Sequence, residues 1–229
     1  MEALLRELGI KQILEFASGI SLRGLAMTED PMVNYVETDL PALTEEKHEI
    51  LRKIMQKYGI MRRQNLHIFS ANILNEREIE RVLPVFRLRE PVAIVHEGLF
   101  PYLNRNERRI AACNIRRVLN RLGGVWITPD LDAKVDLIHN ASDGAAKPIV
   151  DQISLVTGCN VTENAFADDD EMVDFFTREG FEIEAQPMLS ARTELSLYRD
   201  RPMPEEIRVA LKSLRLWVMR VAPKVPGND

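Results

Sequence analysis

Short apolar runs alternate with segments of helical periodicity along most of this chain. Five runs have strand length: Gln12–Phe16, Asn34–Glu37, Leu66–Ser70, Val92–Val95 and Val125–Thr128. Helical spacing follows Pro41 at Ile50, Leu51, Ile54, Met55 and Tyr58. Such alternation is typical of a mainly parallel sheet with helices on both faces. The sequence therefore predicts an α/β fold.

The end of the chain departs from this alternation. Two apolar runs, Phe181–Ala185 and Glu194–Tyr198, follow one another without an intervening helix, which predicts an antiparallel pair. A final amphipathic helix is predicted by apolar residues at Ile207, Leu211, Leu214 and Val218. We therefore expect a single Rossmann-like domain over residues 1–229, with a seven-stranded, mostly parallel sheet and a C-terminal antiparallel strand pair.

The stretch 132–167 has a mixed pattern and is too long for a simple connection. Within it, Ile149–Val156 has helical spacing. The acidic run Asp168–Glu171 comes next, and acids in a first helical turn complement the helix dipole. We interpret the acidic run as a helix start, and 132–167 as an insertion or a lid beside the functional site.

Composition and charge argue against several classes of function. The chain has 229 residues, 45% of them hydrophobic, which is enough for one sizeable core. Its net charge of -5, with acids and bases interspersed, gives no general attraction to nucleic acid. No apolar run has the length of a bilayer span, and the N-terminus has no signal-peptide pattern. We expect a cytoplasmic protein with neither nucleic acid nor membrane as a partner.

Side chains that bind metal or nucleic acid in other proteins are present here without the required pattern. Cys113 and Cys159 lie far apart, and His67 and His96 have no metal spacing, so no metal is expected. One predicted helix carries six arginines, which we interpret as a solvated face: Arg105, Arg108, Arg109, Arg116, Arg117 and Arg121.

The stretch Ile13–Gly24 predicts a ligand-binding loop. An apolar run ends at Glu15 and Phe16, a small-residue turn with Gly19 follows, and an amphipathic segment then resumes. A strand, a tight loop and a helix in this order let the backbone approach a ligand closely. The dinucleotide fingerprint G-x-G-x-x-G is not matched, because only two of its positions are glycine here.

Three stretches together resemble the class I S-adenosylmethionine-dependent methyltransferases, and among them the leucine carboxyl methyltransferase-like family of O-methyltransferases. The loop Glu15–Gly19 is similar to the acid-x-Gly-x-Gly of these enzymes, with Ala17 in the first glycine position. Val36–Pro41, with Lys47 following, resembles their second-strand signature. Glu97–Leu103 resembles their fourth-strand motif, an acid and a glycine followed by an apolar pair and Tyr-Leu.

The resemblance implies S-adenosylmethionine as the cofactor and supplies a set of site residues. It places Asp39 or Glu37 at the ribose hydroxyls, and Asn72 near the adenine, because an amide both donates and accepts hydrogen bonds. Glu97 and Tyr102 are the catalytic candidates, near the methionine moiety or the acceptor. The cofactor-binding candidates are Glu15, Ala17, Gly19, Glu37, Asp39, Asn72, Ile73, His96 and Glu97.

Methyl transfer to the oxygen of a small molecule or a carboxylate is therefore the predicted function. Such a displacement depends mainly on alignment of the reacting atoms, and a carboxylate acceptor needs no general base. The sequence agrees, since it shows no Ser-His-Asp or Cys-His constellation. Two alternatives remain open, a nicotinamide-dependent oxidoreductase and a non-catalytic binding protein with the same fold. Assembly into a homo-oligomer also remains open.

Overall fold

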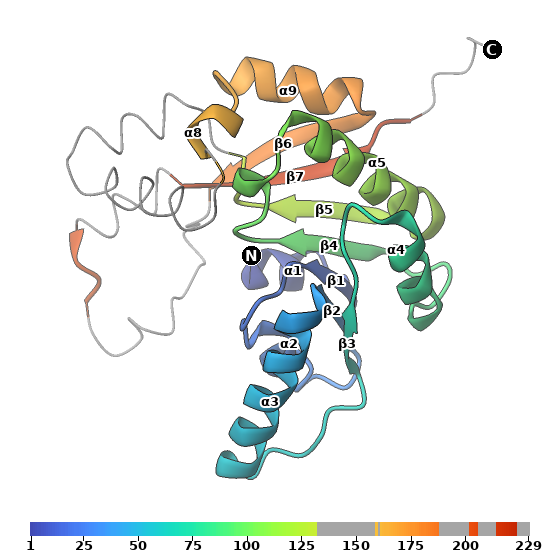
Figure 1. The fold of residues 1–229 in the computed structure, drawn as a ribbon, viewed down its shortest axis with the longest axis vertical. Coiled ribbons are helices and arrows are strands. Elements are labelled where there is room, and N and C mark those ends of the chain that lie inside the picture. Colours follow the sequence, from blue (N-terminus) through green and yellow to red (C-terminus); the bar gives the residue numbers. More distant parts are fainter. Residues whose placement is uncertain (132–158, 160, 188–201, 206–213, 224–229) are drawn as a thin grey trace.

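Seven strands form one sheet in the order β3-β2-β1-β4-β5-β7-β6 (Figure 1). The computed structural model describes residues 1–131, 159, 161–187, 202–205 and 214–223. Strands β1 to β5 pair in parallel, and β7 pairs antiparallel with both β5 and β6. The predicted fold class is confirmed. The strands are β1 (Gln12–Phe16), β2 (Asn34–Asp39), β3 (Leu66–Ser70), β4 (Val92–His96), β5 (Gly124–Thr128), β6 (Phe181–Pro187) and β7 (Arg215–Val221).

Helices cover both faces of the sheet (Figure 1). Those within the described residues are α1 (Glu2–Glu7), α2 (Arg23–Met27), α3 (Pro41–Tyr58), α4 (Glu76–Val82), α5 (Arg105–Leu122), α8 (Val161–Asn164) and α9 (Asp169–Arg178), with short 3-10 helices η1 (Leu83–Val85) and η2 (Phe100–Tyr102). None of these helices is long and apolar enough to cross a membrane.

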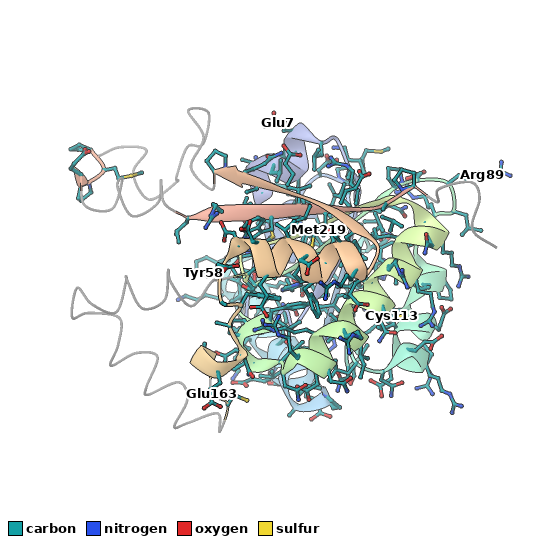
Figure 2. All side chains as sticks on the ribbon, turned by 90° about the horizontal axis from the view of Figure 1, so that it is seen from above. Glu7, Tyr58, Arg89, Cys113, Glu163 and Met219 are labelled. Carbon is teal, nitrogen blue, oxygen red and sulfur yellow. The ribbon has the colours of Figure 1, made fainter. Side chains whose placement is uncertain are left out.

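Each face of the sheet has its own hydrophobic core. Leu14 and Ile94 point into a core that α4, α5 and α9 complete, whereas Ile13 and Ala93 point into a core that α1 and α2 complete. Because successive strand residues point to opposite faces, central strands buried on both sides have to be apolar throughout. Figure 2 shows α9 lying over the last two strands.

Side-chain caps begin three of the helices. Asn75 and Asp168 each accept a backbone hydrogen bond at the start of α4 and α9. Asn104 and Glu107 form a reciprocal capping box at the start of α5. The acidic run Asp168–Glu171 therefore supplies the N-cap and the first turn of α9, in agreement with its predicted role as a helix start.

The predicted final helix is wrong for the part of the chain that the structure describes. Leu214 precedes β7, and Val218 lies within this strand, where it is buried. Strand β7 lies between β5 and β6, so both of its faces are covered: Leu216 and Val218 enter one core, and Trp217 and Met219 the other. The antiparallel partner of β6 is thus β7. The predicted strand 194–198 lies outside the described residues.

The predicted lid or insertion, 132–167, lies largely outside the described residues, as does the predicted helix 149–156. Described residues before and within it lie beside the loop after β4. Asp130, which precedes the stretch, accepts hydrogen bonds from the backbone of Gly98 and Leu99. Asn164 of α8 donates one to the carbonyl of Pro101.

One arginine of α5 departs from the predicted solvated face. Arg108 is buried, and its Nε and Nη2 donate hydrogen bonds to the carbonyl of Phe100 at 3.1 and 2.9 Å. A buried guanidinium is tolerated when its donors are satisfied, and here they fix the start of η2. Arg105, Arg109, Arg117 and Arg121 instead form ion pairs at the surface.

Candidate functional site

The strand order reverses between β1 and β4, which lie side by side at the centre of the sheet. Chains leaving the carboxyl ends of these two strands turn in opposite directions, and open α/β sheets bind ligands at such a switch point. The ends of β1, β2 and β4 meet here, and these strand ends with the loops that follow them contain most of the sequence-predicted site residues.

The loop after β1 is sharply turned. Ala17 and Gly19 both adopt left-handed backbone conformations, with φ of 52° and 47°. This region is disfavoured for alanine, and such strain tends to occur at functional sites. Between them, the Ser18 amide donates to the carbonyl of Thr38 at 3.1 Å, which ties the loop to the end of β2.

Asp39 is the last residue of β2 and lies directly beside this loop. Its Oδ2 accepts a hydrogen bond from the Gly19 amide, and its Oδ1 accepts one from the Leu40 amide, both at 2.7 Å. Each carboxylate oxygen can accept a further hydrogen bond. Asp39 therefore positions the loop and keeps the capacity to bind ligand hydroxyls.

Glu37, the other candidate for the ribose, lies inside the protein. Its carboxylate forms an ion pair with Lys47 at 2.8 Å, with both side chains only 1% exposed. Burial raises the pKa of Glu37, and the neighbouring ammonium of Lys47 opposes the rise. Lys47 also donates a hydrogen bond to Ser18 Oγ at 3.1 Å, so the ion pair holds the loop after β1 from the protein interior.

Arg23 joins the ends of the two central strands. Its Nη1 donates to Glu15 Oε1 at 2.5 Å, and its Nη2 donates to Glu97 Oε2 at 2.7 Å. The hydroxyl of Tyr35 donates to the other Glu15 oxygen at 2.7 Å. Burial raises the pKa of Glu15, with Arg23 and Tyr35 opposing the rise. Glu15 is thus enclosed, whereas the Glu97 side chain is 56% exposed at the edge.

A second buried network orders the loop after β4. His96 Nδ1 lies 2.9 Å from Asp130 Oδ2 and 3.1 Å from Thr128 Oγ1. Asp130 also accepts hydrogen bonds from the Gly98 and Leu99 amides, both at 2.8 Å. Burial would raise the pKa of Asp130, but the hydrogen bonds from His96 and these amides outweigh burial and lower it.

Three further candidates lie near this edge, and no side-chain contact is described between them and Glu15, Asp39 or Glu97. Asn72 follows β3, and its Oδ1 accepts a hydrogen bond from the Leu74 amide at 2.9 Å. The preceding residue, Ala71, donates to the Asp39 carbonyl, so Asn72 lies one strand out from Asp39. Ile73 is buried in the core, and Tyr102 is partly exposed in η2.

Sequence reasoning missed two residues at this edge, Arg23 and Asp130. Arg23 lies within the predicted loop stretch, but its partner Glu97 is 74 positions away. Asp130 had a usable signal, because it is an acid two residues beyond the end of a buried strand, much as Asp39 ends β2. An acid at this position of a parallel sheet is placed at the ligand-binding edge.

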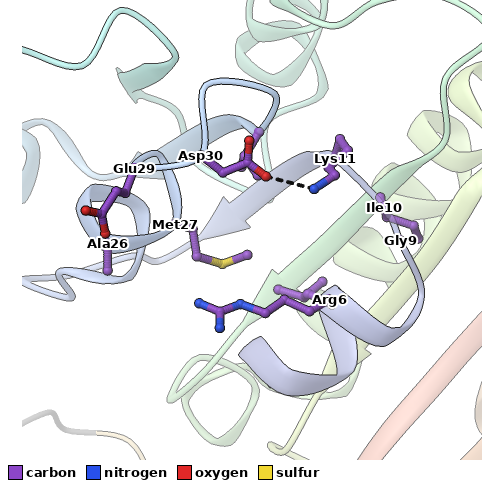
Figure 3. Close-up of a pocket in the computed structure, with 10 residues that line it drawn as sticks. Arg6, Gly9, Ile10, Lys11, Ala26, Met27, Glu29 and Asp30 are labelled. Atoms are coloured by element: carbon purple, nitrogen blue, oxygen red, sulfur yellow. Dashed lines mark hydrogen bonds and ion pairs between the residues drawn. The ribbon is translucent and has the colours of Figure 1, made fainter.

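One cavity lies at the opposite edge of the sheet (Figure 3). It has a volume of about 480 Å³ and is lined by residues of α1, by the turns before β1 and β2, and by the end of α2. Lys11 and Asp30 form an ion pair of 2.8 Å there. Because it lies at the amino ends of the strands, it is separate from the switch point.

Comparison with known proteins gives the fold. No known family model matches the sequence, and no curated protein matches it either. An O-methyltransferase family protein from Burkholderia thailandensis is similar in structure, with a TM-score of 0.53 and 12% identity over 94% of this chain and 52% of that one. The methyltransferase domain of bacterial CtHen1-CN has a TM-score of 0.58 and 11% identity over 96% and 95% of the two chains.

PigF, whose structure was determined with SAH, has a TM-score of 0.54 and 14% identity over 95% of this chain and 53% of that chain. This chain therefore spans about half the length of PigF and of the Burkholderia protein. At such identities the likeness concerns the fold alone: the chain has the α/β fold that these methyltransferases share.

Proposed function

We propose that this protein is an S-adenosylmethionine-dependent O-methyltransferase that acts on a small molecule or a carboxylate. The observation that carries the proposal is the loop after β1, where Ala17 and Gly19 turn the backbone toward Asp39 at the switch point of the sheet. Support also comes from the fold, which is shared with methyltransferases, one of them determined with SAH. The resemblance to the leucine carboxyl methyltransferase-like family remains part of the proposal.

The residues present at this edge suit the proposed cofactor. Asp39 would accept hydrogen bonds from the ribose hydroxyls, since it lies at the strand end while Glu37 is enclosed. Asn72 would contact the adenine from the neighbouring strand. The positively charged Arg23 and the exposed Glu97 would bind the charged methionine end. When bound, the sulfonium of this cofactor supplies an activated methyl group.

The chain's own part in the reaction would be positioning. Glu97 and Tyr102, in and after the turn that follows β4, would orient the acceptor. Asp130 and Arg108 hold this turn by its backbone, so the acceptor side would be rigid before the substrate arrives. Alignment of reacting groups accounts for a large share of the rate in such bimolecular steps.

A paired titration tests the proposal. Purified protein is titrated by calorimetry with S-adenosylmethionine, S-adenosylhomocysteine and NAD, and the cofactor-bound protein is then incubated with carboxylate, phenol and peptide acceptors. We expect binding of the two sulfur nucleosides and methylation of one acceptor class. Binding of NAD alone would favour the oxidoreductase. Tight binding without turnover on any acceptor would favour the non-catalytic alternative.

A further inference from the structure

A second cavity opens beside β3, the strand at the edge of the sheet, between this strand and α3. Figure 1 shows these two elements near one end of the molecule. The cavity has a volume of about 640 Å³, within the range of sites that bind small molecules. Much of its wall is apolar, formed by Leu25, Leu51, Met55, Leu66, Ile68 and Phe69.

The charged part of the lining is mostly positive. Three arginines, Arg52, Arg62 and Arg63, face a single acid, Glu49, which lies 2.9 Å from Arg52. Arg62 and Arg63 form no ion pair or hydrogen bond with any other residue that the structure describes. This local excess of positive charge contrasts with the net charge of -5 of the whole chain.

Arg63 has a hydrogen-bond donor that lacks an acceptor. Its Nε is shielded from water and has no hydrogen-bond acceptor among the described residues. A buried donor without a partner costs free energy, which a ligand oxygen would recover once the guanidinium group turned toward it. The planar fork of an arginine matches carboxylate and phosphate groups, so two such arginines next to an apolar wall favour an anion with an apolar body.

The cavity is centred away from the switch point, where the proposed cofactor would bind. Its first lining residue on α3, His48, lies seven positions beyond Pro41, which begins the helix, and so about 10 Å farther along the axis. Its lining residues on β3 also precede Ser70, where the strand ends. The lining includes none of the residues proposed to bind the cofactor.

We propose that this cavity binds a small amphiphilic anion, an alkyl or aryl carboxylate or phosphate monoester, as a ligand distinct from the methyl donor. The guanidinium groups of Arg62 and Arg63 would bind the acidic head, and the apolar wall between α3 and β3 would take the body of the ligand. A free small molecule fits better than a membrane, because the site is concave.

The test uses octyl phosphate and octanoate below their micelle concentrations, measured by calorimetry on the full chain. Inorganic phosphate and octylammonium are the comparison ligands, since one lacks the apolar body and the other reverses the charge. We expect both octyl anions to bind, with the comparison ligands at least about tenfold weaker. Arg62→Gln and Arg63→Gln should each weaken octyl phosphate by about tenfold, as loss of one charged hydrogen bond predicts.

Arg77→Gln is the matched control, because Arg77 is an exposed arginine of α4 outside the cavity. It should leave octyl phosphate affinity unchanged, and the thermal midpoint of each variant shows that it is folded. Equal affinity for octyl phosphate and octylammonium would overturn the proposal. So would unchanged affinity in the Arg62→Gln, Arg63→Gln double variant. Binding to phosphatidylglycerol vesicles without binding to soluble octyl phosphate would overturn the small-molecule assignment.

Discussion

Asp39 has two roles that can be separated by substitution. It orders the loop through the Gly19 amide, and it is the proposed acceptor for the ribose. Asp39→Ala removes both contributions and should weaken S-adenosylmethionine binding by about 1.5 to 3 kcal/mol, measured by calorimetry. Asp39→Asn keeps an oxygen for the Gly19 amide and loses the charge, so its loss should be smaller.

The control for this prediction is Asp30→Ala. Asp30 is a partly exposed aspartate at the opposite edge of the sheet, where it pairs with Lys11. Its removal should leave cofactor affinity unchanged. Unchanged affinity in Asp39→Ala would contradict the ribose assignment.

Asp130 should make stability depend on pH in the acidic range. Its pKa in the folded protein lies below the ordinary value of 3.8. Its stabilising contribution is therefore fully present above pH 3.8 and is lost as the pH falls through the folded pKa. Asp130→Asn should lower the free energy of unfolding by about 1 to 3 kcal/mol at pH 7, and this difference should shrink toward pH 3.

Urea denaturation of both proteins between pH 3 and pH 7 measures the effect. Asp174→Asn is the control, since Asp174 is an exposed acid on α9. A difference between the wild type and Asp130→Asn that stays constant over this range would show that the hydrogen bonds of Asp130 are not those described.

The position of a single residue in the fold was predictable from the sequence where the local pattern fixes it, whereas its role in binding stays a prediction. Asp39 and Gly19 each follow a strand-like run, and the parallel arrangement then brings both to one edge. The role of Arg23 was not predictable, because its bond to Glu97 depends on which strand lies next to β1. Glu37 was ambiguous for a related reason: only packing shows that Lys47 encloses it.

At the scale of elements, the capping box of α5 should contribute measurably to stability. Asn104 accepts hydrogen bonds from the amides of Asn106 and Glu107. Asn104→Ala leaves these amides without their acceptor and should lower the free energy of unfolding by about 1 kcal/mol. Chemical denaturation measures the change.

Asn106→Ala in the same turn is the control for helix propensity, because its exposed side chain has no capping role. Its effect should stay within about 0.5 kcal/mol. Equal losses in the two variants would show that the side chain of Asn104 does not cap the helix.

Strands and helix starts with a clear local sequence pattern were predicted closely. Strand β7, which is recognised only by the strands beside it, was not. β1 and β3 begin and end at the predicted residues, and the acidic run that starts at Asp168 begins α9, as expected. β7 failed because a strand buried on both faces is apolar at consecutive positions, so residues at helical spacing can be picked out of it. Only its place between β5 and β6 identifies it as a strand.

At the scale of the whole molecule, β7 completes the sheet from the far end of the chain. It pairs with β5 on one side and β6 on the other. Its side chains enter both cores, and on one face they belong to the same core as those of α9. The chain has two tryptophans, Trp126 on β5 and Trp217 on β7. Trp126 lies opposite Met219 in the register of these strands, so fluorescence reports on this part of the sheet.

Met219→Lys tests the strand assignment and its global consequence together. In β7 the Met219 side chain is fully buried, so a lysine there would place an unpaired charge in the core and should cost at least about 3 kcal/mol. In the amphipathic helix predicted from the sequence, position 219 would lie off the apolar stripe and would tolerate lysine.

Arg220→Gln is the control, since the Arg220 side chain is 46% exposed. If all seven strands unfold as one cooperative unit, tryptophan fluorescence and circular dichroism should give coincident urea transitions, shifted to lower urea in Met219→Lys alone. A fluorescence transition that precedes the loss of helical signal in the wild type would show that β7 and its neighbours unfold separately from the β1 to β4 half of the sheet.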